Sequence, residues 1–157
     1  MLLPRIAAAA LIVAGAVLAP VPALAATSPD EPDLQQQIDA VLAEFPGGTQ
    51  TAPNEVSWQD GTVVLTLAND EQVAARSVGS CATGTHCVYS GSGLSGSKLT
   101  FSTCSTQSVA PLGAPVASIA NARSVVVRAY NSIGVVGSVS ANSSANTGSW
   151  GVTKVGC

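Results

Sequence analysis

The sequence predicts an all-β protein in which a short helix and a β-hairpin precede a domain of short strands. After Arg76 the chain consists of β-rich runs separated by loops of Gly, Ser, Asn and Pro. An Asp60-Gly61 pair lies between two further β-rich runs, and such a pair is typical of a tight hairpin turn. The stretch from Asp33 to Phe45 instead has the apolar spacing of a helix.

Residues 1–25 have the features of a signal peptide. Arg5 is the only charge before Asp30, and the apolar run that follows it, from Ile6 to Leu18, is too short to span a bilayer comfortably. Prolines end this run, and Ala23-Leu24-Ala25 supplies the small residues that signal peptidase recognises. We therefore expect a secreted protein that is cut after Ala25 and has no membrane segment in its mature chain.

The segment 26–75 is expected to be an acidic extension made of a leader, a helix and a hairpin. Asp33 can cap the helix, whose apolar residues Leu34, Ile38 and Phe45 share one face, and the Pro-Gly-Gly sequence that follows ends it. The runs 55–59 and 62–67 flank the Asp-Gly turn as two strands. We expect the helix and the hairpin to pack on the β domain that follows them.

The domain 76–157 differs from the extension in charge. All nine acidic residues lie between Asp30 and Glu71, whereas residues 72–157 carry five basic side chains and no carboxylate side chain. The β domain therefore lacks a carboxylate for acid, base or nucleophilic catalysis, and we do not expect an enzyme. The single histidine, His86, is expected to be an exposed loop residue. Five runs in this domain are expected to be strands: Cys87–Tyr89, Lys98–Ser102, Ser124–Tyr130, Val135–Val139 and Gly151–Val155.

Four cysteines, Cys81, Cys87, Cys104 and Cys157, lie in the C-terminal half of the chain. An even number of cysteines in an exported chain predicts two disulfides, for which three pairings are open. Zinc sites use paired short Cys and His spacings, and Cys81–Cys87 is the only close pair here. We therefore expect disulfides, no metal and no cofactor.

An aromatic residue, a glycine and a serine recur with the same spacing in two places in the β domain. Each residue of the second set lies 41 positions after its counterpart, which indicates an internal repeat. The pattern resembles the Greek-key motif of βγ-crystallins, in which the glycine allows a folded-over hairpin under the aromatic ring and the serine hydroxyl ties that hairpin down. The resemblance implies a βγ-crystallin-like double Greek-key domain. The two sets are Tyr89, Gly96, Ser102 and Tyr130, Gly137, Ser143.

The run from Cys81 to Gly96 resembles the start of the secreted metalloproteinase inhibitors of streptomycetes, which also open with two cysteines five residues apart and a YSGxGLSG-type sequence. These inhibitors are single βγ-crystallin-like domains, and the similarity covers about residues 78–157. The segment 117–124 resembles the family's Asn-containing stretch between its two Greek keys. The resemblance, together with a reversal at Gly84, implies disulfides Cys81–Cys87 and Cys104–Cys157.

The resemblance implies that the protein inhibits extracellular, thermolysin-like metalloproteases or is a binding module derived from such an inhibitor. The family presents its reactive strand after the second aromatic residue, and these proteases favour a bulky aliphatic residue just after the scissile bond. The candidates there are Ile133, Val135 and Val136. In the best-known member of the family this loop carries its own disulfide, whereas this chain has no cysteine between Cys104 and Cys157. We expect a monomer that binds no nucleic acid and no membrane. The calcium-binding motif of crystallins is not complete in this sequence. The alternative is a structural or toxin-like βγ-crystallin protein that acts on cell walls or membranes.

Overall fold

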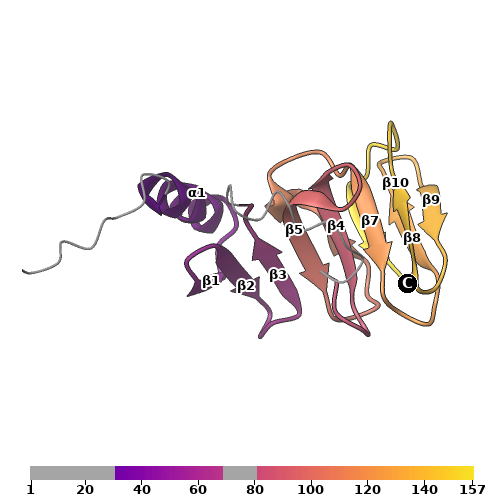
Figure 1. The fold of residues 1–157 in the computed structure, drawn as a ribbon, viewed down its shortest axis with the longest axis horizontal. Helices are drawn as coiled ribbons and strands as arrows, with labels where there is room; N and C mark the ends of the chain where they lie inside the picture. The colour runs from indigo at the N-terminus through magenta and orange to yellow at the C-terminus, as the bar shows by residue number, and fades with distance from the viewer. Residues whose placement is uncertain (1–30, 69–80) are drawn as a thin grey trace, which may run out of the picture.

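The computed structural model describes residues 31–68 and 81–157, so the expected signal peptide, the leader before the helix and the linker 69–80 lie outside it. Within these ranges the chain forms one α-helix, a 3₁₀ turn at Ala110–Leu112 and eleven strands (Figure 1). The expectation of an all-β protein with one preceding helix is confirmed. The helix is not long and apolar enough to cross a membrane. The elements are α1 (Glu31–Glu44), β1 (Thr49–Ala52), β2 (Glu55–Trp58), β3 (Val63–Thr66), β4 (His86–Gly91), β5 (Ser95–Phe101), β6 (Gln107–Ser108), β7 (Ser118–Asn121), β8 (Val127–Tyr130), β9 (Val135–Val139), β10 (Ser143–Asn146) and β11 (Lys154–Gly156).

Helix α1 places its predicted apolar face on the protein core. Ile38 is fully buried, and Leu34 and Phe45 pack against the same apolar cluster. The helix starts two residues before Asp33, so Asp33 lies in the first turn and is not the cap that the sequence suggested. A proline at the second helical position fits this earlier start, because the first turn needs no N–H donor there.

The N-terminal hairpin, β2–β3, turns at the predicted Asp-Gly pair. Asp60 and Gly61 have φ angles of 53° and 86°, and the Thr62 N–H donates to the Gln59 carbonyl at 3.1 Å. Strand β1 pairs with the outer side of β2 and adds a third strand to the hairpin. The local turn chemistry therefore fixes this part of the fold.

Strand β3 joins the extension to the β domain, because it pairs antiparallel with β5, with Val63 opposite Phe101 and Leu65 opposite Leu99. The result is one seven-stranded sheet in the order β1-β2-β3-β5-β4-β7-β10. The charges of the two parts also interact: burial lowers the pKa of Lys98 in β5, and the Glu55 carboxylate in β2 acts in the opposite direction. The extension is therefore part of the same sheet and not a separate domain.

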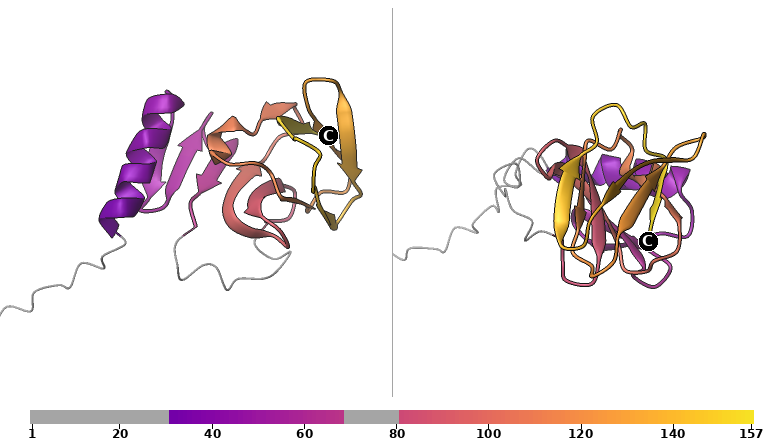
Figure 2. Two further views of the ribbon diagram at one scale, coloured as in Figure 1. Left: turned by 90° about the horizontal axis from the view of Figure 1, so that it is seen from above. Right: turned by 90° about the vertical axis from the view of Figure 1, so that its right-hand side faces the viewer.

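The second sheet has the order β6-β11-β8-β9. Strands β4 to β7 form a first unit and β8 to β11 a second, and each unit opens with a hairpin. The fourth strand of each unit pairs with the first strand of the same unit, whereas the third strand lies in the other unit's sheet. Figure 2 shows these sheets side by side, with the β8–β9 hairpin far from α1.

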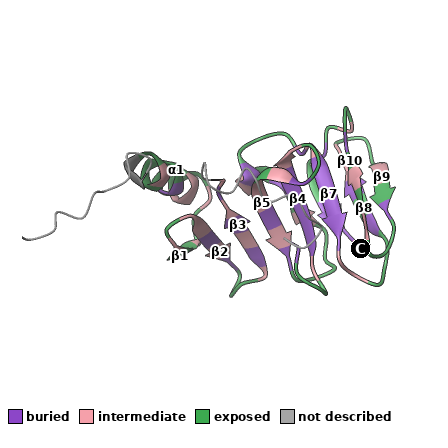
Figure 3. Ribbon diagram, viewed as in Figure 1, coloured by how far each residue is buried: buried purple, intermediate pink, exposed green. Residues whose placement is uncertain are grey.

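A single apolar cluster joins α1, the extension and both sheets. It includes Ile38 from the helix, Val56 from β2, Leu99 and Phe101 from β5, and Val155 from β11, all fully buried. Figure 3 shows the buried residues along the middle strands, while part of β9 is exposed. The β8–β9 hairpin therefore stands at the edge of a well-packed body.

Candidate functional site

The three residues of the predicted inhibitory loop occupy different environments on the β8–β9 hairpin. Ile133 is 93% exposed and Val135 is 57% exposed, whereas Val136 is half-buried and packs against the core. The structure therefore presents Ile133 and Val135 to solvent and turns Val136 partly inward. In the described ranges only two other large hydrophobic residues are exposed, Val125 and Val126. They precede β8 and so lie at the end of this strand that is away from the turn.

Asn131, which follows β8, organises the turn that carries Ile133. Its side-chain Oδ1 accepts hydrogen bonds from the N–H groups of Ile133, at 2.8 Å, and Gly134, at 3.2 Å. Its own N–H donates to the Gly134 carbonyl at 2.9 Å. An asparagine side chain that bonds to the backbone two residues further on is a recurrent turn-forming device. The exposed tip therefore has a defined conformation without a local disulfide.

The first hairpin, β4–β5, occupies the corresponding place in the first unit and is folded inward. The Ser118 hydroxyl donates to the Gly91 carbonyl at 2.6 Å and accepts from the Leu94 N–H at 3.0 Å. Leu94, at the tip, is buried against Tyr89 and the Cys81–Cys87 disulfide. A buried serine on β7 therefore holds this hairpin against the body.

The second hairpin lacks the equivalent tie. Ser118 lies opposite Tyr89 in the pairing of β4 with β7, and the residue opposite Tyr130 in the pairing of β8 with β11 is Lys154. Lys154 is exposed and has no acceptor atom on its side chain. Val135 lies five residues after Tyr130, as Leu94 lies five residues after Tyr89, but Val135 is exposed whereas Leu94 is buried. The two hairpins thus occupy corresponding places in the two units, but the tip of the first is bound to the body of the protein and the tip of the second is exposed to solvent.

The serine part of the predicted repeat needs correction. Ser102 follows β5 and is exposed, and its hydroxyl donates to the Thr62 carbonyl at 3.3 Å instead of tying a hairpin. Ser143 lies in β10, opposite Asn121. The tying serine is Ser118, which the 41-residue spacing could not identify because its contact with the hairpin depends on the pairing of β7 with β4.

The aromatic residues and glycines of the repeat also differ between the units. Tyr89 is buried and Tyr130 is half-buried. Gly96 has a φ of 77°, a conformation that side-chain-bearing residues rarely adopt, so it permits the fold of the first hairpin. Gly137 instead lies directly under the indole ring of Trp150, where a Cβ atom would overlap the ring. The second glycine therefore makes room for an aromatic neighbour.

Trp150 supports the displayed hairpin from one side. Its ring packs on Gly137 in β9, and its carbonyl accepts a hydrogen bond from the Asn131 side-chain amide at 3.5 Å. The turn that carries Trp150 is itself held in place, because the Trp150 N–H donates to the carbonyl of the buried Thr147 at 3.0 Å. The base of the hairpin is therefore packed although its tip is exposed.

His86 is a core residue and not the exposed loop residue that the sequence suggested. It begins β4, is fully buried and stacks on Phe101 with ring centroids 5.1 Å apart. Its Nδ1 accepts from the Arg123 Nε–H at 3.1 Å, while its Nε2 has no hydrogen-bond partner. Burial, assisted by the positive charge of Arg123, lowers the pKa of His86 to about 4. The chain's one imidazole is thus neutral near pH 7 and shielded from solvent.

The two disulfides have the predicted pairing, Cys81–Cys87 and Cys104–Cys157. The first closes the short loop that leads into β4, and the second joins the segment after β5 to the end of β11. Within residues 31–68 and 81–157, no group of three or more His, Cys, Asp or Glu side chains is arranged to hold a metal ion.

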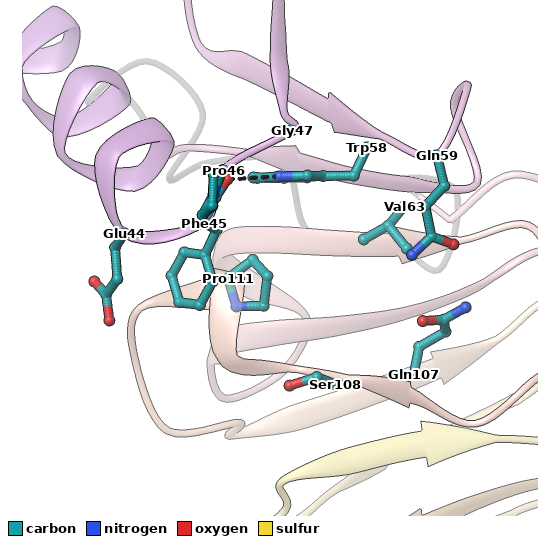
Figure 4. Close-up of a pocket in the computed structure, with 10 residues that line it drawn as sticks. All are labelled: Glu44, Phe45, Pro46, Gly47, Trp58, Gln59, Val63, Gln107, Ser108 and Pro111. Carbon is teal, nitrogen blue, oxygen red and sulfur yellow. Dashed lines mark hydrogen bonds between the residues drawn. The ribbon is translucent and has the colours of Figure 1, made fainter.

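A pocket of about 450 Å³ lies where the extension meets the β domain (Figure 4). Phe45 and Pro111 lie beside each other in it, and the Trp58 indole N–H donates to the Phe45 carbonyl at 3.0 Å. Its lining comes from the end of α1, the N-terminal hairpin, β6 and the 3₁₀ turn. The pocket therefore lies at the contact between the extension and the β domain, and Figure 1 shows that α1 and the β8–β9 hairpin are at opposite ends of the molecule.

The chain was compared with protein-family models, curated proteins and solved structures. No protein-family model, curated protein or solved structure matches the chain.

Proposed function

We propose that this protein is a secreted inhibitor of thermolysin-like metalloproteases and that the β8–β9 hairpin is the part that enters the protease cleft. One observation carries the proposal: Ile133 is 93% exposed at the tip of a turn whose backbone is fixed by hydrogen bonds. Exposing a large aliphatic side chain in a rigid turn brings the folded protein no stability, whereas it suits a residue that a partner's pocket will bury.

The fold part of the proposal is a βγ-crystallin-like double Greek key of the streptomycete inhibitor type. Two features support it: each unit gives its third strand to the other sheet, and the first hairpin is folded over and tied by a serine hydroxyl. The two disulfides support a protein that works in an oxidising compartment, outside the cell.

Ile133 is the best candidate for the residue just after the scissile bond. Val136 packs inward, and Val135 already belongs to β9, where it pairs with Tyr130. Full burial of an isoleucine side chain in a protease pocket would contribute about 1.5–3 kcal/mol. Because the turn is formed before binding, little of this free energy is needed to order the loop.

The test compares two aspartate substitutions at exposed aliphatic residues. Purified mature protein is titrated into thermolysin while hydrolysis of a peptide substrate is followed. Ile133→Asp should weaken inhibition by at least about 30-fold, which corresponds to the loss of about 2 kcal/mol of apolar contact. Val125→Asp is the matched control, because Val125 is 47% exposed at the other end of β8 and should tolerate the change.

Two results would reject parts of the proposal. Absence of inhibition by the folded wild-type protein, against thermolysin and a panel of secreted metalloproteases, would reject the inhibitor function. Equal inhibition by Ile133→Asp and Val125→Asp, with both folds intact by circular dichroism, would move the binding site away from this hairpin.

A further inference from the structure

A loop that enters a protease cleft is exposed to cleavage, and this chain has no cysteine between Cys104 and Cys157 that could cross-link the β8–β9 hairpin. We infer that Asn131 supplies a non-covalent cross-link in its place, by holding together the two sides of the Ser132–Ile133 peptide bond. The inference rests on the proposed function for its biological meaning, and on the hydrogen bonds of the turn for its physical content.

Three hydrogen bonds of Asn131 cross the Ser132–Ile133 bond. Asn131 lies on the N-terminal side of that bond, and all three partners lie on its C-terminal side. They are the N–H of Ile133, the N–H of Gly134 and the carbonyl of Gly134. The pairing of Tyr130 with Val135 spans the same bond one residue further out. No covalent link is needed for the two sides to stay adjacent.

The bond nearest the protected peptide is the one from the Ile133 N–H to Asn131 Oδ1, at 2.8 Å. Hydrolysis would add water across the peptide bond and leave a carboxylate on Ser132 and an amine on Ile133. The nitrogen of that amine is the atom already held by Asn131 Oδ1, and its protonated form is a stronger donor than the amide.

The cut ends would therefore stay together instead of separating. Reversal of the cut, in which the amine attacks the carboxyl group and water leaves, would remain an intramolecular step between prepositioned groups. The Asn131 side-chain N–H bond to the Trp150 carbonyl, at 3.5 Å, keeps the asparagine oriented toward the turn. Asn131 is thus a positioning residue for the hairpin tip and does not react itself.

The inference is tested with Asn131→Ala, Asn131→Asp and a matched control, Asn146→Ala. Asn146 also accepts from a hairpin-tip amide, the Gly93 N–H at 2.9 Å, but in the first hairpin. In Asn131→Ala, hydrogen exchange at the Ile133 and Gly134 amides should rise about fivefold, as expected for the loss of one hydrogen bond. Asn131→Asp keeps the acceptor and should restore slow exchange, while Asn146→Ala should leave these two amides unchanged.

The second measurement follows cleavage of the same four proteins by thermolysin, with mass spectrometry of the fragments. Asn131→Ala should be cut at Ser132–Ile133 at least about tenfold faster than the wild type, and its inhibition should fade with time. Asn131→Asp and Asn146→Ala should resemble the wild type. Circular dichroism first establishes that each variant is folded. If Asn131→Ala is not, Asn131→Leu replaces it, because leucine has nearly the shape of asparagine and no acceptor atom, so it removes the same two hydrogen bonds.

The outcomes separate this inference from the proposed function. Unchanged exchange at Ile133 and Gly134 in Asn131→Ala would overturn the role of Asn131, whether or not the protein inhibits. Faster exchange with no inhibition by the wild type would uphold the role of Asn131 and reject the inhibitor function. Faster exchange with cleavage no faster than in the wild type would overturn the claim that these bonds protect the peptide.

Discussion

Replacement of Ser118 by alanine tests how the first hairpin is held. The Ser118 hydroxyl is fully buried and serves two backbone groups, the Leu94 N–H at 3.0 Å and the Gly91 carbonyl at 2.6 Å. Alanine leaves both groups without this partner while Leu94 stays in its buried position. An unsatisfied buried group costs about 1–3 kcal/mol, and the carbonyl is only half-buried, so we expect a loss of about 2–3 kcal/mol in the free energy of unfolding.

The assay is denaturant unfolding followed by circular dichroism, with Ser102→Ala as the control. Ser102 is the serine that the sequence repeat assigned to this role, but it is exposed and bonds to the Thr62 carbonyl at 3.3 Å. Ser102→Ala should therefore change the free energy of unfolding by less than about 0.5 kcal/mol. In thermal unfolding, Ser118→Ala should lower the Tm by about 10 °C. A loss below about 1 kcal/mol for Ser118→Ala, or an equal loss for both variants, would refute the assignment.

Two further predictions concern stability. The pKa of His86 is lowered to about 4, so between this value and about 6.5 the unfolded chain binds more protons than the folded one. The contribution of His86 to the free energy of unfolding should be constant above pH 6.5 and fall on acidification, by up to about 3 kcal/mol at pH 4. Denaturant unfolding at pH 7.5 and 4.5 should show this loss in the wild type and much less of it in His86→Gln. Equal losses in both proteins would assign the effect to other groups. Ile38→Ala should cost about 2–5 kcal/mol, because Ile38 joins α1 to the common core, whereas the exposed Gln37→Ala should be neutral. If both helix variants unfold like the wild type, α1 does not contribute to the stability of the β domain.

Local chemistry made part of this fold predictable from sequence. The Asp60-Gly61 turn, the apolar stripe of α1 and most strand cores were predicted, because each depends on neighbouring residues. Strands β1, β6, β7 and β10 were not predicted. Sequences such as Gln107–Ser108 and Ser143–Asn146 are short and polar, so only their partners in the other unit make them strands.

Contacts between distant residues explain the errors at the candidate site. The sequence indicated a loop after Tyr130 with three aliphatic residues, but it could not show that Ile133 is exposed and that Val136 packs against the core. The role of Ser118 and the burial of His86 depend on the pairing of β4 with β5 and β7. Asn131 had a local pattern that could have been used, since an asparagine three residues before a glycine favours a turn.

The exchange of third strands between the two units has a consequence for folding cooperativity. Strand β6 belongs to the first unit but pairs with β11 of the second, and β10 belongs to the second unit but pairs with β7 of the first. Neither unit can complete its sheet until the other is in place, and the Cys104–Cys157 disulfide closes the same interlock. We therefore expect the two units to unfold together in a single transition, without a stable intermediate in which only one of them is folded.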